Sequence, residues 1–175
     1  MKKTILKFGL YSAITIVVLF SINLFTPLAE LDMGIQEVLG YLAMFIALIF
    51  VFFGIKSYRD QQLNGSISFG KGFKLGFLIT LIPATIFGIF DVIYILMNPE
   101  FFQNYRDAAV ADLEKQFSGA ELTAKIKEID DMMAFAGNPA FDFFLMFSTV
   151  LILGIIVSLI SSFILRKDTP KQEAA

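Results

Sequence analysis

The stretch that decides the fold lies near the C-terminus, where residues 143–165 read FFLMFSTVLILGIIVSLISSFIL. This run has no charged residue, and as a helix it is long enough to cross a bilayer core, which takes about 20 apolar residues. Residues 8–29 and 38–55 are equally free of charge, and residues 75–99 carry only Asp91. Nothing alternates as the strands of a membrane β-barrel do. The sequence therefore predicts a four-helix membrane bundle of the all-α class, a single domain over residues 1–175. We place the spans at about 5–26, 36–56, 74–97 and 140–165.

The composition agrees with a lipid environment and excludes several kinds of chemistry. Hydrophobic residues make up 57% of the chain and charged residues 17%, against about 45–50% and about 25% in soluble domains. The chain has no His and no Cys, which removes zinc fingers, thiolate nucleophiles and Ser–His triads. We expect no catalytic residue, no metal, no cofactor and, at a net charge of −2, no nucleic-acid partner.

The first apolar run resembles a signal peptide, because Lys2, Lys3 and Lys7 precede it. Its apolar part exceeds the roughly 7–15 residues of a signal peptide, and residues 25–29 lack a small-x-small cleavage site. We therefore expect the run to remain as the first transmembrane helix.

Basic residues predict the orientation of the bundle, since Lys and Arg accumulate in cytoplasmic loops. Ten of the 14 fall before the first span, between the second and third, or after the fourth, including Lys171. The opposite side carries Glu30, Asp32 and Glu37 in one loop and nine acidic residues between residues 98 and 142. Both termini are therefore predicted to be cytoplasmic.

The long outer segment, about 100–136, has helical periodicity. One apolar stripe runs from Phe101 to Phe117 and a second from Leu122 to Met133, with a break at Ser118–Gly119. The sequence predicts two amphipathic helices, with Asn98 and Asn138 as N-caps before Pro99 and Pro139. Their apolar faces could pack on each other and on the outer mouth of the bundle, lie in the membrane interface, or dock a partner.

Small residues mark the helix faces expected to pack closely, because helices in lipid associate through close backbone approach. The third span repeats a small residue every four positions, and the fourth does the same over a shorter stretch. This pattern fits packing inside one subunit or a dimer interface. The residues are Gly72, Gly76, Thr80, Ala84 and Gly88, with Gly154 and Ser158.

Asp91 is the ionisable residue that lies well inside a predicted span. An ionised carboxylate there is costly unless it is paired, so we expect protonation or a hydrogen bond to neutral groups. Asn23 falls at a similar depth in the first span, and Tyr94 shares the helix face of Asp91. Asp142 is expected near the outer surface, as an anion at a helix N-terminus. The hypotheses for Asp91 are a structural hydrogen-bonded group or a proton or cation site.

The segment between the second and third spans is predicted to be a cytoplasmic loop that starts with Gly54, Lys56, Tyr58, Arg59 and Asp60. Its basic residues can meet anionic headgroups and anchor the topology. Gly65, Gly70 and Gly72 permit turns, and Ser66 or Ser68 could cap the next helix.

This segment also carries a family resemblance. Residues 54–60, GIKSYRD, and residues 65–76, GSISFGKGFKLG, resemble the signature of the bacterial membrane family called domain of unknown function 4199. The four spans and the long acidic loop also fit that family. The resemblance implies an inner-membrane protein of a Bacteroidetes-type, Gram-negative cell, with periplasmic outer loops, and it implies no activity or catalytic residue.

From these observations we expect a non-enzymatic inner-membrane protein, a scaffold or accessory subunit that binds protein or lipid. Its expected partners are membrane lipid and a membrane protein or a second copy of the chain. The alternative is a small oligomeric transporter or an ion or proton conduit that uses Asp91.

Overall fold

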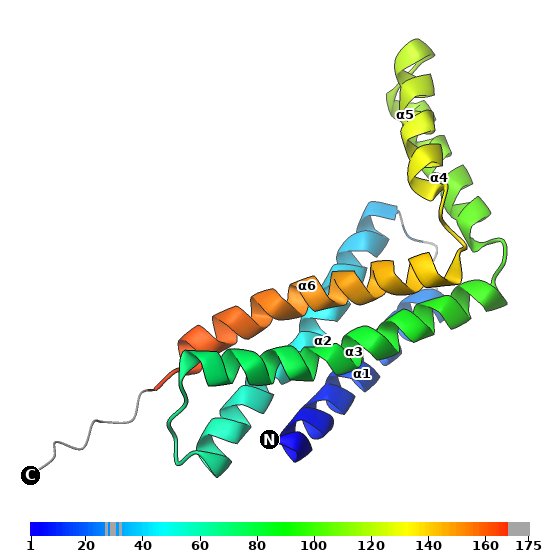
Figure 1. The fold of residues 1–175 in the computed structure, drawn as a ribbon. Coiled ribbons are helices and arrows are strands. Elements are labelled where there is room, and N and C mark those ends of the chain that lie inside the picture. Colours follow the sequence, from blue (N-terminus) through cyan, green and yellow to red (C-terminus); the bar gives the residue numbers. More distant parts are fainter. Residues whose placement is uncertain (27, 29–30, 32, 168–175) are drawn as a thin grey trace, which may run out of the picture.

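The computed structural model describes residues 1–26, 28, 31 and 33–167, and over this part the chain is helical. Figure 1 shows the long helices side by side in a bundle and, beyond one end of them, a hairpin of shorter helices. Three of the predicted charged residues lie outside the described residues: Glu30, Asp32 and Lys171. The same holds for residues 27 and 29, at the end of the first uncharged run. The helices are α1 (Lys2–Phe25), α2 (Met33–Gln62), α3 (Phe69–Met97), α4 (Phe101–Gln116), α5 (Gly119–Met133) and α6 (Pro139–Leu165).

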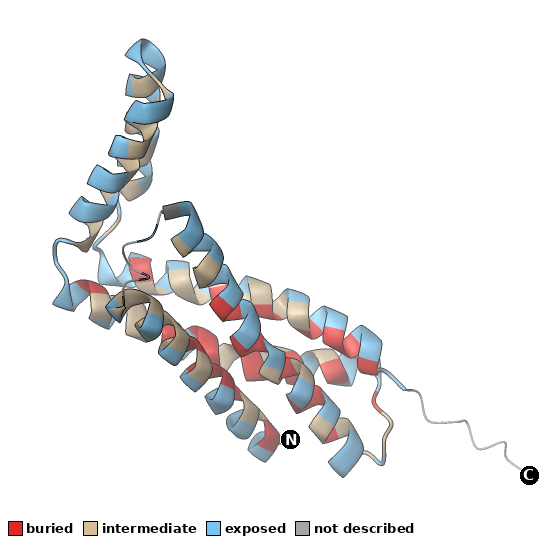
Figure 2. Cartoon of the chain, turned by 180° about the vertical axis from the view of Figure 1, so that it is seen from behind, coloured by how far each residue is buried: buried red, intermediate tan, exposed pale blue. Residues whose placement is uncertain are grey.

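The predicted all-α membrane fold is confirmed. Helices α1, α2, α3 and α6 are each long and apolar enough to cross a membrane. The fully buried residues lie in this bundle, whereas apolar side chains such as Phe144, Ile152 and Phe163 are exposed on its outside (Figure 2). Exposed apolar surface around a packed interior is what a lipid environment requires of a membrane protein.

Two boundaries differ from the sequence prediction. Helix α2 continues to Gln62, so the residues predicted as the start of a cytoplasmic loop, Gly54 to Asp60, are helical. Helix α3 already begins at Phe69, so Gly70 and Gly72 are helical rather than turn residues. The reason is that both helices extend past the apolar core and carry their first or last turns in the polar zone, where composition no longer signals a span.

The prediction for the two Asn-Pro pairs is half right. The Asn138 side chain accepts hydrogen bonds from the N–H groups of Ala140 and Phe141 and caps α6. Asn98 instead ends α3, where its own N–H donates to the carbonyls of Tyr94 and Ile95. Helix α4 starts two residues beyond Pro99, after Glu100. The same dipeptide can therefore end one helix as readily as it begins another.

Helices α3 and α6 pack antiparallel through the predicted small residues. A Cβ atom built on Gly76 would lie 2.7 Å from Ser158 Oγ, and one built on Gly72 would lie 3.1 Å from Ser162 Oγ. In the same way, the side chain of Thr80 occupies the space where Gly154 would carry a Cβ atom. Each four-residue step along α3 thus meets a four-residue step along α6 in the opposite direction. The small-residue stripe of α3 is used for packing inside one chain, which leaves it buried rather than available to a second copy.

The outer hairpin of α4 and α5 stands away from the bundle (Figure 1). Its apolar stripes, which include Leu113, Ile126 and Ile129, are half-buried against each other, and neither helix contains a fully buried residue in the described structure. Arg106 of α4 holds Asp130 of α5 through two hydrogen bonds of 2.6 and 3.1 Å. The hairpin is therefore not a lid packed over the mouth of the bundle, which was one of the predicted arrangements.

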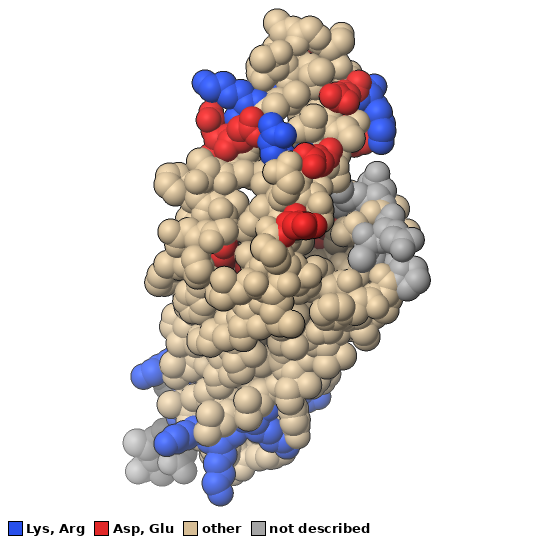
Figure 3. Space-filling model, turned by 90° about the vertical axis from the view of Figure 1, so that its right-hand side faces the viewer, with Lys and Arg blue, Asp and Glu red and all other residues tan. Residues whose placement is uncertain are grey.

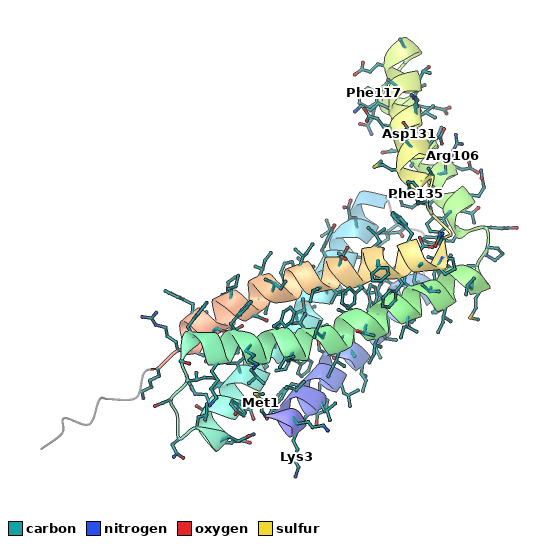
Figure 4. The ribbon with its side chains drawn as sticks, in the orientation of Figure 1. Met1, Lys3, Arg106, Phe117, Asp131 and Phe135 are labelled. Atoms are coloured by element: carbon teal, nitrogen blue, oxygen red, sulfur yellow. The ribbon has the colours of Figure 1, made fainter. Side chains whose placement is uncertain are left out.

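Charge separates along the molecule. Figure 3 shows the Lys and Arg side chains of the bundle at the end opposite the hairpin, with a band of uncharged surface between that end and the acidic residues. Met1 and Lys3 lie at the same basic end (Figure 4). The helices thus place the charges on the two sides that the sequence predicts.

Candidate functional site

The candidate site lies at the hairpin end of the bundle and begins with Asn23 and Asp91. Helices α1 and α3 run side by side there: the rings of Phe20 and Phe87 are 4.4 Å apart, and those of Phe25 and Tyr94 are 6.3 Å apart. Asn23 follows Phe20 by three residues and Asp91 follows Phe87 by four, so each lies about one helical turn closer to the hairpin than this ring pair. The two residues are therefore at the same level of the bundle. The structure therefore agrees with the depth that the sequence suggested for both residues.

Asp142 joins these two residues, which the sequence prediction missed. A Cβ atom on Gly88 would touch the backbone carbonyl of Phe143 at 3.0 Å, so α3 and α6 are in close contact one turn from Asp91. The carboxyl groups of Asp91 and Asp142 lie near enough to interact electrostatically. Asp142 lies in the first turn of α6, at the helix N-terminus where the sequence places it, and it is only 3% exposed.

The outer polar site, which we define as Asn23, Asp91 and Asp142, has more acceptors than donors. One oxygen on each side chain is buried without a hydrogen-bond partner in the described structure: Asn23 Oδ1, Asp91 Oδ2 and Asp142 Oδ2. Asp142 also accepts a hydrogen bond from the backbone N–H of Gly137. A buried carboxyl group without a hydrogen-bond partner favours protonation or a bound cation, because an ionised carboxylate is costly in a low-dielectric setting.

Tyr94 does not belong to this polar site. Its ring packs edge-on against Phe25 and Phe101, the latter at 5.5 Å. Phe101 in turn packs on Phe102, and Phe135 packs on Phe141 across the hairpin base. Tyr94 therefore helps to attach the hairpin to the bundle, a role that follows from aromatic packing.

An outer cavity of about 540 Å³ adjoins the polar site. Its walls come from α1, α2, α4 and α6, and Asn23 belongs to them. Buried Met44 lies at its inner end, while Glu37, Tyr41 and Tyr105 line it nearer the surface. Nothing in the sequence alone indicates this cavity, because its walls come from four helices that only the fold brings together. The one feature visible in the sequence is that Glu37 and Tyr41 are four residues apart, which puts them on the same face of α2.

The signature residues of α2 organise the opposite, basic end. Gly54 lets the neighbouring helices approach, since a Cβ atom there would lie 2.5 Å from Ile79 Cδ1 and 3.2 Å from Phe8 Cβ. Tyr58 is buried in the core, with Lys71 Nζ 6.0 Å from its ring centre. Lys56 is exposed. Its side chain remains available for the interface, while Gly54 and Tyr58 pack within the protein.

Arg59 and Asp60 help to close this end. Arg59 Nη1 donates a hydrogen bond to the carbonyl of Leu165, the last residue of α6, and Arg59 Nε donates to Asp60 Oδ1 at 2.7 Å. Next to them, Ile67 and Lys167 exchange two backbone hydrogen bonds of 3.0 Å. We call this arrangement the inner latch. It ties the α2–α3 connection to the end of α6 and satisfies carbonyls that a helix end leaves open.

Comparison with known proteins gives one informative result. No curated protein and no solved structure matches the chain. The family model described as "Protein of unknown function (DUF4199)" matches residues 7–167 and so includes every residue of the inner latch and the outer polar site. With the four apolar helices, this match identifies a membrane protein. The chain belongs to this family of proteins of unknown function.

Proposed function

We propose that this protein is a non-enzymatic scaffold or accessory subunit of the bacterial inner membrane, whose α4–α5 hairpin docks a partner protein in the periplasm. The observation that carries the proposal is the hairpin itself, which projects from the bundle instead of covering it (Figure 1). A connector between two adjacent spans needs only a few residues, whereas this one forms two helices of 16 and 15 residues.

The surface of the hairpin supports a docking role. Met132 at the end of α5 and Phe135 in the connection that follows are 70% and 64% exposed. Phe135 lies near the bundle and Phe117 farther out (Figure 4). Large apolar side chains that stay exposed outside the apolar zone are typical of a protein interface. The absence of His and Cys from the sequence favours binding over catalysis.

The orientation that the proposal needs rests on the charges. The basic end of the bundle (Figure 3) fits the cytoplasmic side, because cytoplasmic loops are rich in Lys and Arg. The hairpin then lies in the periplasm of a Gram-negative, Bacteroidetes-type cell, and both termini face the cytoplasm.

Affinity purification in mild detergent tests the docking role, with bound proteins identified by mass spectrometry. We expect a stoichiometric partner on the wild type and its loss from Met132→Asp, which places a charge in the exposed apolar surface. Ala120→Asp is the matched control, since Ala120 is exposed at the start of α5, where an acidic residue is favourable. Equal partner recovery from the two variants, or a clean homo-oligomer from the wild type, would contradict the proposal.

A conduit is the second candidate, and the outer polar site favours it. Asp91, Asp142 and Asn23 lie at the hairpin end of the bundle, and each has one buried oxygen without a hydrogen-bond partner among the described residues. Such a group can take up and release a proton or a small cation. Liposomes containing the protein, placed under a proton, sodium or potassium gradient, would show flux that Asp91→Asn abolishes. Glu121→Gln, on the exposed surface of α5, serves as the control. Wild-type vesicles without flux for any of the three ions would rule out this candidate.

A further inference from the structure

The outer cavity has the shape and depth of a site within one leaflet. On α2 it runs from Gln36 and Glu37 to Met44, and on α6 it extends inward to Thr149. Thr149 lies ten residues after Pro139, so at 1.5 Å per residue the cavity extends about 15 Å from the outer end of α6. This is about half of the roughly 30 Å hydrocarbon core of a bilayer. The length therefore matches the acyl region of a single leaflet.

The side chains change character along this length. Met44 is 6% exposed at the inner end, near Phe20 and Met146, and these side chains are apolar. At the outer end the wall holds Glu37, Gln36 and Tyr105. Tyr41 and Leu145 flank the cavity and are 44% and 48% exposed, so it opens between α2 and α6 toward the surrounding lipid. An apolar interior with a polar mouth at the membrane surface suits an amphiphile.

The charged and aromatic residues at the outer end of the cavity indicate which lipid headgroup would bind there. Among the described residues that line the cavity, Glu37 is acidic and none is Lys or Arg. The rings of Tyr41, Phe101 and Tyr105 belong to the same wall. A cavity lined by a carboxylate and by aromatic rings attracts an ammonium group through charge and cation–π interactions, whereas a headgroup with only a phosphate would meet the carboxylate without compensation.

We propose that the outer cavity binds one phospholipid with an ammonium headgroup, which places an acyl chain against Met44 and Met146 and its ammonium group beside Glu37. This lipid site does not depend on the docking role of the hairpin, because its chemistry comes from the bundle and the first turns of α4. The docking role of the hairpin does not involve the outer cavity, and the lipid proposal gives this cavity a class of ligand.

Native mass spectrometry of the full chain tests the site directly. The purified protein is offered equal amounts of palmitoyl-oleoyl phosphatidylethanolamine and phosphatidylglycerol, which share their acyl chains and differ in the headgroup. We expect the ethanolamine lipid to be retained about fivefold over the glycerol lipid, the size of effect that one ammonium group gives beside a carboxylate and aromatic rings at a partly exposed site. We expect Glu37→Gln to lower this ratio clearly while total lipid binding continues, because the variant keeps the aromatic rings and loses the carboxylate.

Filling the cavity separates this site from general lipid adhesion. A Cβ atom on Gly40 has ordinary contacts, the nearest at 3.6 Å from Phe20 Cζ, so the ring in Gly40→Phe enters the cavity and should remove the retained lipid. Leu42→Phe is the matched control, because Leu42 is exposed on the same helix, and Met146→Trp fills the cavity from α6 if Gly40→Phe fails to fold. Equal retention of the two lipids by the wild type, an unchanged ratio in Glu37→Gln, or full retention by a folded cavity-filling variant would overturn the proposal.

Discussion

At the scale of single residues, small side chains determine how closely the helices approach. Gly9, Gly54, Gly76 and Gly154 all sit where a Cβ atom would collide with a side chain of another helix. Because lipid tails are as apolar as the helices, association in a membrane depends on such close packing more than on burial of apolar area. Gly70 differs from them, although it lies on the same helix as Gly76, because a Cβ atom added there would have no atom of another part of the chain within 4 Å.

This difference predicts opposite effects of one substitution at two positions of α3. We expect Gly76→Ala to destabilise the protein by about 1–3 kcal/mol, because the added methyl group would lie 2.7 Å from Ser158 Oγ and 3.0 Å from Ile55 Cδ1. Gly70→Ala should be neutral or stabilising by up to about 1 kcal/mol, since it removes backbone freedom from the unfolded chain and meets no neighbour. Thermal unfolding in detergent micelles measures both, and equal melting temperatures for the two variants would contradict the α3–α6 packing.

At the scale of elements, the hairpin is held mainly by contacts between its own arms. The stripes of α4 and α5 are half-buried, and the Arg106–Asp130 pair crosses between the helices at 2.6 Å. The hydrogen bond from Arg106 lowers the pKa of Asp130 below its usual range, and the same pair raises the pKa of Arg106. Both groups are exposed, so the pair contributes modestly, but it lies where few other contacts join the two arms.

The lowered pKa predicts an acid-sensitive hairpin. A carboxyl group with a lower pKa in the folded state stabilises that state above its unfolded pKa, about 3.9 for aspartate. This contribution is lost as the pH falls through the lowered folded value. Spin labels at exposed Ala108 and Ala124 should give a narrow distance distribution at neutral pH that broadens below about pH 4. Arg106→Gln should broaden it already at neutral pH. An unchanged distribution in that variant would show that the ion pair does not position the arms.

At the scale of the whole molecule, the two ends of the bundle differ in the features that they contain. The inner latch joins the α2–α3 connection to the end of α6 through Arg59, Ile67 and Lys167, so these contacts stabilise the basic end. The hairpin end holds the outer polar site, the outer cavity and the α4–α5 hairpin. A division of this kind predicts that substitutions in the latch affect folding, whereas substitutions at the other end affect binding.

The predicted orientation can be tested with introduced cysteines, because the chain has no Cys of its own. Ser118 lies in the turn of the hairpin and Gln61 near the end of α2, and both are exposed. A membrane-impermeant thiol reagent added to intact spheroplasts should label Ser118→Cys and leave Gln61→Cys unlabelled until the cells are opened. The reverse pattern would invert the topology and place the hairpin in the cytoplasm.

The sequence by itself determined the membrane class, the four helices and the hairpin, because these depend on runs of apolar residues and on periodicity, which are local properties. It also identified Asp91, since a charge inside an apolar run is visible without a structure. It misplaced residues 54–60 in a loop, because helices can continue into the polar zone with the composition of a loop. Only the tertiary structure packed α6 on α3 one turn from Asp91, bonded Arg59 to the end of α6 and formed the outer cavity. Each of these features joins residues that are far apart in the chain. Such contacts depend on the register between packed helices, and the fit of many side chains at once determines that register.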